Sequence, residues 1–128
     1  MSAIFPMSDR EWHFYVDDMI GFAERATMYP AGMQQSEFQS NPLVRDATLR
    51  NLELIGEAAL HIPQAIRDSS PKIPWRQIIA TRNRLIHGYL GIDDDTIWSI
   101  IRDDLPPLLA ALRAIRGMLN QLGSPSTS

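Results

Sequence analysis

The 128-residue sequence contains no cysteine, and only one of its twelve basic residues, Lys72, is a lysine. The missing cysteines exclude disulfide bonds, thiol catalysis and cysteine-ligated zinc. No run of about 18 apolar residues is present, so the sequence predicts no membrane-spanning helix. The N-terminal residues lack a basic region followed by a long apolar stretch, so we expect no signal peptide and a bacterial-type cytoplasmic location.

Positive charge is also scarce, because fifteen acidic residues outnumber the basic ones and give a net charge of -3. A protein that binds long nucleic acid over its whole surface is usually basic. Any contact with nucleic acid must therefore come from a local basic patch, or from an oligomer that concentrates one. The length favours a single domain, which we place at residues 1–122, with a flexible C-terminal tail at 123–128.

No segment of convincing length shows the apolar–polar alternation of a β-strand. Apolar residues recur instead at three- and four-residue steps, which predicts long helices near residues 8–29, 41–61, 74–88 and 93–119, with short helical pieces near Phe38 and residues 63–67. Pro106-Pro107 should kink or restart the last helix. The fold class is therefore all-α, a compact up-and-down bundle of four to five helices.

The second predicted helix is apolar over most of its circumference, which is typical of a helix central in a bundle. Its capping residues are Asn41 and Pro42. One narrow polar stripe remains on this helix, made of Asp46, Arg50, Glu53, Glu57 and His61.

The third predicted helix places an arginine where an apolar residue is expected. On a helical wheel that starts at Trp75, the apolar residues fall within about 80° on either side, and Arg82 lies inside that arc. Tyr89 falls there too, whereas Asn83 and His87 share the flank. An unpaired buried guanidinium costs several kcal/mol, so Arg82 must reach an acid, a solvent cleft or another subunit.

Two interpretations of Arg82 follow. In the structural one, Glu53 or Glu57 pairs with it across the bundle and the other polar residues are ordinary helix-end residues. In the functional one, Arg82 holds a phosphate and His87 transfers protons, as RNA cleavage without a metal requires. On an ideal helix these two side chains diverge by about 140°, so they meet most easily if the helix unwinds at Gly88 or if a two-fold axis joins two chains.

The stretch "RNRLIHGY", which contains Arg82, Asn83, His87 and Tyr89, resembles the Arg-polar-x-x-x-His motif of HEPN-domain ribonucleases and the Arg-x4-His-x-Tyr extension of their HepT branch. The segments "LRNLELIGEAA" at 49–59, "IPWRQIIATRNRLIHGYLGID" at 73–93 and "IW......LPPLL" at 97–109 resemble the same family in the same order.

The resemblance implies a homodimer with the motifs at its cleft and metal-independent cleavage of RNA, either tRNA or mRNA. It gives Arg82 and His87 catalytic roles and Asn83 an orienting role, with Glu53 and Glu57 as candidate supporting residues. Such proteins are similar to toxins of type VII toxin–antitoxin modules, whose usual antitoxin is an MNT-type nucleotidyltransferase that can attach AMP to the motif tyrosine, here Tyr89.

A non-catalytic alternative remains open, in which the bundle is the substrate-binding or partner module of a two-component nucleotidyltransferase. The sequence predicts no cofactor and no metal, because His13 and His61 lack a second ligand at metal spacing. Helix capping explains the "DDD" at 93–95 better than magnesium does.

Overall fold

The computed structural model describes residues 9–88 and 91–123 of the chain. The long helices are α1 (Asp9–Met28), α3 (Pro42–Leu60), α5 (Trp75–His87) and α7 (Leu105–Gly123). The short helices are α2 (Gln35–Gln39), α4 (Gln64–Asp68) and α6 (Asp94–Ser99). No strand occurs in these ranges, which confirms the predicted all-α fold. Almost all of the predicted tail, and Ser8 of the first helix, lie outside the described residues.

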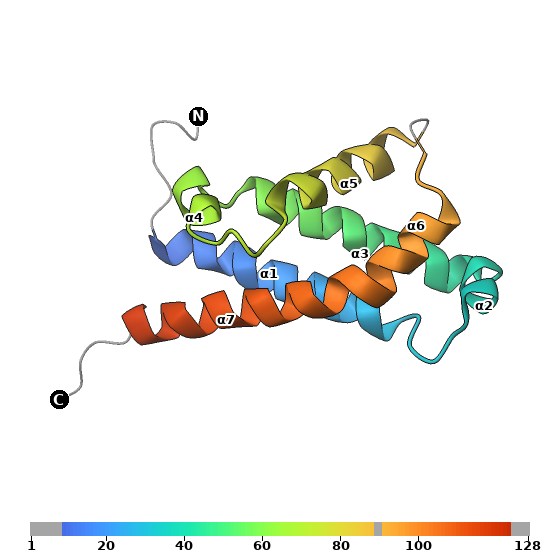
Figure 1. Ribbon diagram of the computed structural model, residues 1–128, viewed down its shortest axis with the longest axis horizontal. Helices are drawn as coiled ribbons and strands as arrows, with labels where there is room; N and C mark the ends of the chain where they lie inside the picture. The colour runs from blue at the N-terminus through green and yellow to red at the C-terminus, as the bar shows by residue number, and fades with distance from the viewer. Residues whose placement is uncertain (1–8, 89–90, 124–128) are drawn as a thin grey trace.

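The four long helices lie side by side in the order α7, α1, α3, α5 (Figure 1). α1 packs against both α3 and α7, and α3 packs on its other side against α5. This arrangement makes α1 and α3 the central helices, as the apolar circumference of α3 predicts. α5 packs mainly against α3, so it forms one outer edge of the bundle.

One contiguous core fills the space between α1, α3 and α7. Trp12, Val16 and Met19 enter it from α1, and Leu112 enters it from α7. The other buried apolar residues are Ala23, Ala26, Phe38, Leu52, Ile55, Ala58, Ala59, Ile62, Ile73, Trp75, Ile97, Ile101, Leu105, Leu108 and Leu109. The core is thus continuous along the length of the bundle.

Asn51 is a polar residue inside this core, and both polar atoms of its side chain are hydrogen-bonded. Its Oδ1 accepts a hydrogen bond from Arg25 Nε at 3.2 Å, and its Nδ2 donates to the Ala47 carbonyl at 2.9 Å. Because α1 carries Arg25 and α3 carries Asn51, this bond ties the two central helices together. A buried amide left without such partners would destabilise the fold.

The predicted helix starts are confirmed where they can be examined. Asn41 Oδ1 accepts from the Val44 amide at 3.1 Å, with Pro42 in the first turn of α3. Asp93 Oδ1 accepts from the Thr96 amide at 2.7 Å at the start of α6. Each bond satisfies one of the amides that the first turn of a helix leaves without a partner.

Pro106 and Pro107 do not break the last helix. A five-residue π-helical segment, Ile100–Asp104, connects α6 directly to α7. In it the Leu105 amide donates to the Ile100 carbonyl, five residues back. In place of the predicted kink or restart, the chain forms a widened helical turn just before the two prolines. Proline has no amide N–H to donate, so the regular hydrogen bonding of a helix cannot continue unchanged there.

The apolar arc of α5 is only partly buried. Ile86 belongs to the apolar arc of the helical wheel, yet 42% of it is exposed to solvent, and only Trp75 is buried on this helix. The reason is the position of α5 at the edge of the bundle, where α3 is its main neighbour. In a single chain, part of the apolar face of α5 therefore has no helix packed over it.

Candidate active site

The motif occupies the last turns of α5, which ends at Gly88. Gly88 has a φ of 55°, a region that favours glycine, and its amide donates to the Arg84 carbonyl at 3.2 Å. His87 is thus the last residue of the helix, and it is exposed. Tyr89, the predicted modification target, lies outside the described residues.

The side chain of Arg82 is held by two neighbours. Its Nε and Nη2 both donate to Oε1 of Glu57, at 2.9 and 2.6 Å, and its Nη1 donates to Oδ1 of Asn83 at 2.8 Å. Glu53, the other acid considered for this role, pairs with Arg50 instead. The ion pair that the structural interpretation expects between Arg82 and a glutamate of α3 is therefore present, and its acid is Glu57.

The ion pair is not sealed inside the protein. The side chain of Arg82 is 25% exposed and that of Glu57 is 37% exposed. The three hydrogen bonds engage three of the five N–H groups of a guanidinium, so two remain for a phosphate oxygen. The geometry leaves Arg82 fixed in place and still accessible, which suits a group that must bind a substrate without rearranging.

Gly56 explains how Arg82 comes to lie at this spot, although it is outside the sequence motif. A Cβ atom added at Gly56 would lie 2.2 Å from Cβ of Arg82 and 3.1 Å from the Ile78 carbonyl oxygen. Only glycine permits so close an approach of α3 and α5. The signal in the sequence was a glycine next to Glu57 inside an otherwise regular helix.

Arg82 and His87 are not brought together within one chain. α5 is helical through both residues, so their side chains leave the helix in directions about 140° apart. Asn83 and His87, four residues apart, share one flank of α5. α5 stays helical up to its C-cap at Gly88, so unwinding does not bring these two side chains together in this structure.

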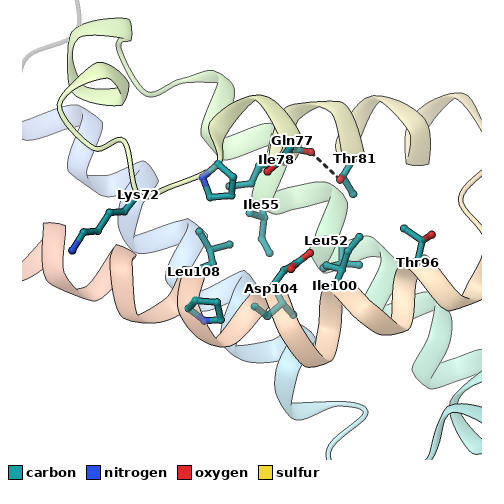
Figure 2. A pocket seen from close by; sticks show the side chains of 13 residues that line it. Leu52, Ile55, Lys72, Gln77, Ile78, Thr81, Thr96, Ile100, Asp104 and Leu108 are labelled. Carbon is teal, nitrogen blue, oxygen red and sulfur yellow. Dashed lines mark hydrogen bonds between the residues drawn. The ribbon is translucent and has the colours of Figure 1, made fainter.

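A groove of about 470 Å³ runs along the other flank of α5 (Figure 2). Its floor comes from α3 and its opposite wall from the π-helical segment and α7. Lys72 lies at one end and Thr96 at the other. On the α5 side it is lined by Gln77, Ile78 and Thr81, which point about 80–180° away from Asn83 and His87. This groove is therefore separate from the flank that carries His87.

The acidic run after the motif serves the start of α6. The amide of Thr96, and secondarily its side chain, hold the pKa of Asp93 below its ordinary value through hydrogen bonds, and the charge of Arg84 acts in the same direction. Asp94 pairs with Arg45, and Asp95 accepts from Gln35. The interpretation of this run as helix capping is confirmed for Asp93.

Within residues 9–88 and 91–123, no three histidine, aspartate or glutamate side chains are grouped to hold a metal ion.

The fold and the site together describe a helical bundle that presents a fixed arginine beside a polar helix end, and comparison with known proteins supplies the family. Residues 17–115 match the model of the HepT-like family, described as ribonuclease HepT-like. The chain is 34% identical over 102 residues to a candidate RNase of Methanocaldococcus jannaschii, covering 80% of this chain and 94% of that protein. It is 30% identical over 102 residues to a probable ribonuclease HepT of Thermococcus cleftensis, covering 80% and 93%.

The chain therefore belongs to the HepT-like ribonuclease family. No solved structure gives a significant match to it. In the described part of the chain, none of the helices has both the length and the apolar character that crossing a membrane requires.

Proposed function

We propose that this protein is an endoribonuclease toxin that cleaves RNA without a metal, with Arg82 and His87 as its catalytic residues. Membership of the HepT-like ribonuclease family supports the reaction class. The observation that carries the assignment is the Arg82 guanidinium, which Glu57 and Asn83 fix beside the motif while two of its N–H groups stay available. A purely structural ion pair needs no such accessible face.

The reaction requires two proton transfers and stabilisation of charge. A base removes the proton of the 2′-hydroxyl, the 2′-oxygen attacks the phosphorus, and the bond from phosphorus to the 5′-oxygen breaks. An acid protonates the leaving 5′-oxygen, which gives a 2′,3′-cyclic phosphate and a 5′-hydroxyl. Histidine suits both proton transfers near neutral pH, and arginine stabilises the negative charge that develops on the phosphorane.

A homodimer would supply the two histidines that this scheme uses. Arg82 and His87 diverge by about 140° on α5, so one chain does not present both to one phosphate. A two-fold axis perpendicular to α5, passing between these two positions, would set two copies of the helix antiparallel and place the Arg82 of one protomer opposite the His87 of its partner. The exposed side chain of Ile86 lies between them on the same helix, so such a contact would cover it.

We further propose that an MNT-type nucleotidyltransferase is the antitoxin and that it acts by AMPylation of Tyr89. The support is the position of Tyr89 in the sequence, two residues beyond His87 and immediately after Gly88. An AMP group there adds bulk and negative charge next to the proposed phosphate site, and both would exclude RNA.

The experiment is expression of wild-type, His87→Ala and Arg82→Ala proteins in cells without any partner gene. We expect growth arrest and fragmented RNA with the wild type alone. Purified wild-type protein should also cleave RNA in the presence of a chelator and leave 2′,3′-cyclic phosphate ends. Circular dichroism establishes that the variants are folded. Folded variants that remain as toxic as the wild type refute the assignment of these residues.

The second candidate function is a non-catalytic module that binds a nucleotidyltransferase and presents a substrate to it. The bond between Arg82 and Glu57 favours it, because that bond also suits a purely structural arginine. It predicts a stable complex with the partner and no cleavage of RNA by the free, folded protein. Intact RNA in the experiment above would support this module and contradict the ribonuclease.

A further inference from the structure

A second pocket, of about 350 Å³, lies between α4 and the start of α5. Gln64, Arg67 and Asp68 line it from α4, and Trp75, Arg76 and Ile79 line it from α5. We call it the α4–α5 pocket. Two arginine side chains bordering one small cavity are a suitable arrangement for an anion with several oxygens, since guanidinium groups bind phosphate in a bidentate manner.

The two arginines are among those that form no ion pair in the described part of the chain. Five arginines form ion pairs with acids, and neither Arg67 nor Arg76 is among them within the described residues. Arg67 donates through Nε to the Ile62 carbonyl at 3.1 Å, which orients its guanidinium and leaves both terminal nitrogens for a ligand. The nearby carboxylate of Asp68 accepts a hydrogen bond from Gln64 at 2.8 Å.

The pocket is aligned with the proposed active site. Arg76, Asn83 and His87 lie within about 40° of one another around α5, so they form one stripe along the helix. Arg76 is about 10 Å from Asn83 and about 16 Å from His87 along the axis, at a rise of 1.5 Å per residue. A single RNA strand that passes His87 along this flank of α5 would therefore reach the pocket.

We propose that the α4–α5 pocket binds a backbone phosphate of the substrate RNA, several nucleotides away from the bond that is cut. This inference rests on the proposed ribonuclease function. Arg67 and Arg76 provide the positive charge that an acidic protein lacks over most of its surface, and they provide it on the flank where the strand must lie. The pocket then holds the strand in register while Arg82 and His87 act on it.

Binding to a fluorescent single-stranded RNA with 2′-O-methyl groups tests the pocket without cleavage, because the methylated 2′-oxygen does not attack phosphorus. Arg67→Gln and Arg76→Gln should each weaken binding about five-fold at low salt. Each should also lower the slope of log affinity against log salt by about 0.7, the value for one lost phosphate contact on a single strand.

Two further variants make the test specific. Arg113→Gln removes the same charge from α7, where Arg113 pairs with exposed Glu24, and it should leave affinity and slope unchanged. Asp68→Asn removes the negative charge beside the pocket and should tighten binding about two- to five-fold. That change in the opposite direction keeps the test informative if an arginine variant does not fold.

Cleavage of unmodified RNA by the wild type, measured in parallel, separates the two proposals. If the wild type cleaves RNA while the folded Arg67→Gln, Arg76→Gln and Asp68→Asn proteins bind as it does, the phosphate pocket is refuted and the ribonuclease stands. If slopes and affinities change as expected but no cleavage occurs, the pocket is supported and the ribonuclease is refuted. If Arg113→Gln weakens binding as much as the pocket variants, the effect is one of net charge and the pocket is refuted.

Discussion

The close approach of α3 and α5 makes Gly56→Ala the most informative single change. The new Cβ would stand 2.2 Å from Arg82 Cβ, and ordinary van der Waals contact begins at 3.4 Å. Neither atom is the end of a flexible side chain, so the two helices must separate. Overpacking of this kind costs about 1–3 kcal/mol, and alanine regains about 1 kcal/mol through its higher helix propensity. We expect an overpacking cost in the upper part of that range. After the gain in helix propensity is subtracted, the net loss of stability is about 1–2 kcal/mol.

Gly117→Ala on α7 is the matched control. Nothing in the described part of the chain lies within 4 Å of a Cβ atom added there, so only the gain in helix propensity applies, about 0.5–1 kcal/mol. Thermal unfolding followed by circular dichroism, at one protein concentration, should separate the two alanine proteins by roughly 8 °C. Gly56→Ala should also lose RNA cleavage, because the separation of the helices carries Arg82 away from Glu57.

A double change tests the cause. Arg82→Ala retains its Cβ and should not restore the stability of Gly56→Ala. Arg82→Gly removes that atom, and although a second helix glycine has its own cost of about 1 kcal/mol, it should relieve the clash when combined with Gly56→Ala. If Gly56→Ala is as stable as Gly117→Ala, the reasoning about the helix contact is wrong.

Three further outcomes are expected. Because the pKa of Asp93 is lowered in the folded protein, the stability that its cap on Thr96 contributes is fully present above the unfolded-state pKa of about 3.9 and is lost as the pH falls through the lower folded pKa. Asp93→Asn caps without titrating, so it should remove this part of the acid dependence of the urea midpoint. An unchanged pH profile would contradict the cap. Asn51→Ala should cost about 1–3 kcal/mol in urea unfolding, because it leaves Arg25 Nε without its acceptor, and a loss within error would show that water replaces it. Glu57→Gln should change stability by less than about 1 kcal/mol, since the ion pair is partly exposed, and a much larger loss would mean that the pair is effectively buried.

The helices and their starting residues could be predicted from the sequence because they depend on local chemistry. Asn41 followed by proline, and Asp93 three residues before Thr96, define helix starts wherever the helices later pack. Apolar spacing likewise predicted the central place of α3, although Leu43 and Leu60 of its apolar set are exposed and Thr48 and Asn51 are buried. These features need only the residues within a few turns of one helix.

The site depended on how two helices approach each other, which spacing along one helix does not contain. The sequence left Glu53 and Glu57 equally open as partners of Arg82, and the contact at Gly56 decides between them. The same limit explains Ile86, which a helical wheel places in the apolar arc without showing that no neighbouring helix covers it. The π-helical turn before Pro106 also requires knowledge of how α7 meets the bundle.

The attachment of α5 to the bundle through α3 has a consequence for motion. Helices held on several sides exchange their amide hydrogens only when the whole protein unfolds, whereas an edge helix can open on its own at a lower free energy. In hydrogen-exchange measurements, the amides of α5 should therefore exchange faster than those of α1 and α3. A second copy or a bound strand lying along α5 would slow that exchange, so the protection of this one helix would report directly on whether the proposed cleft has formed.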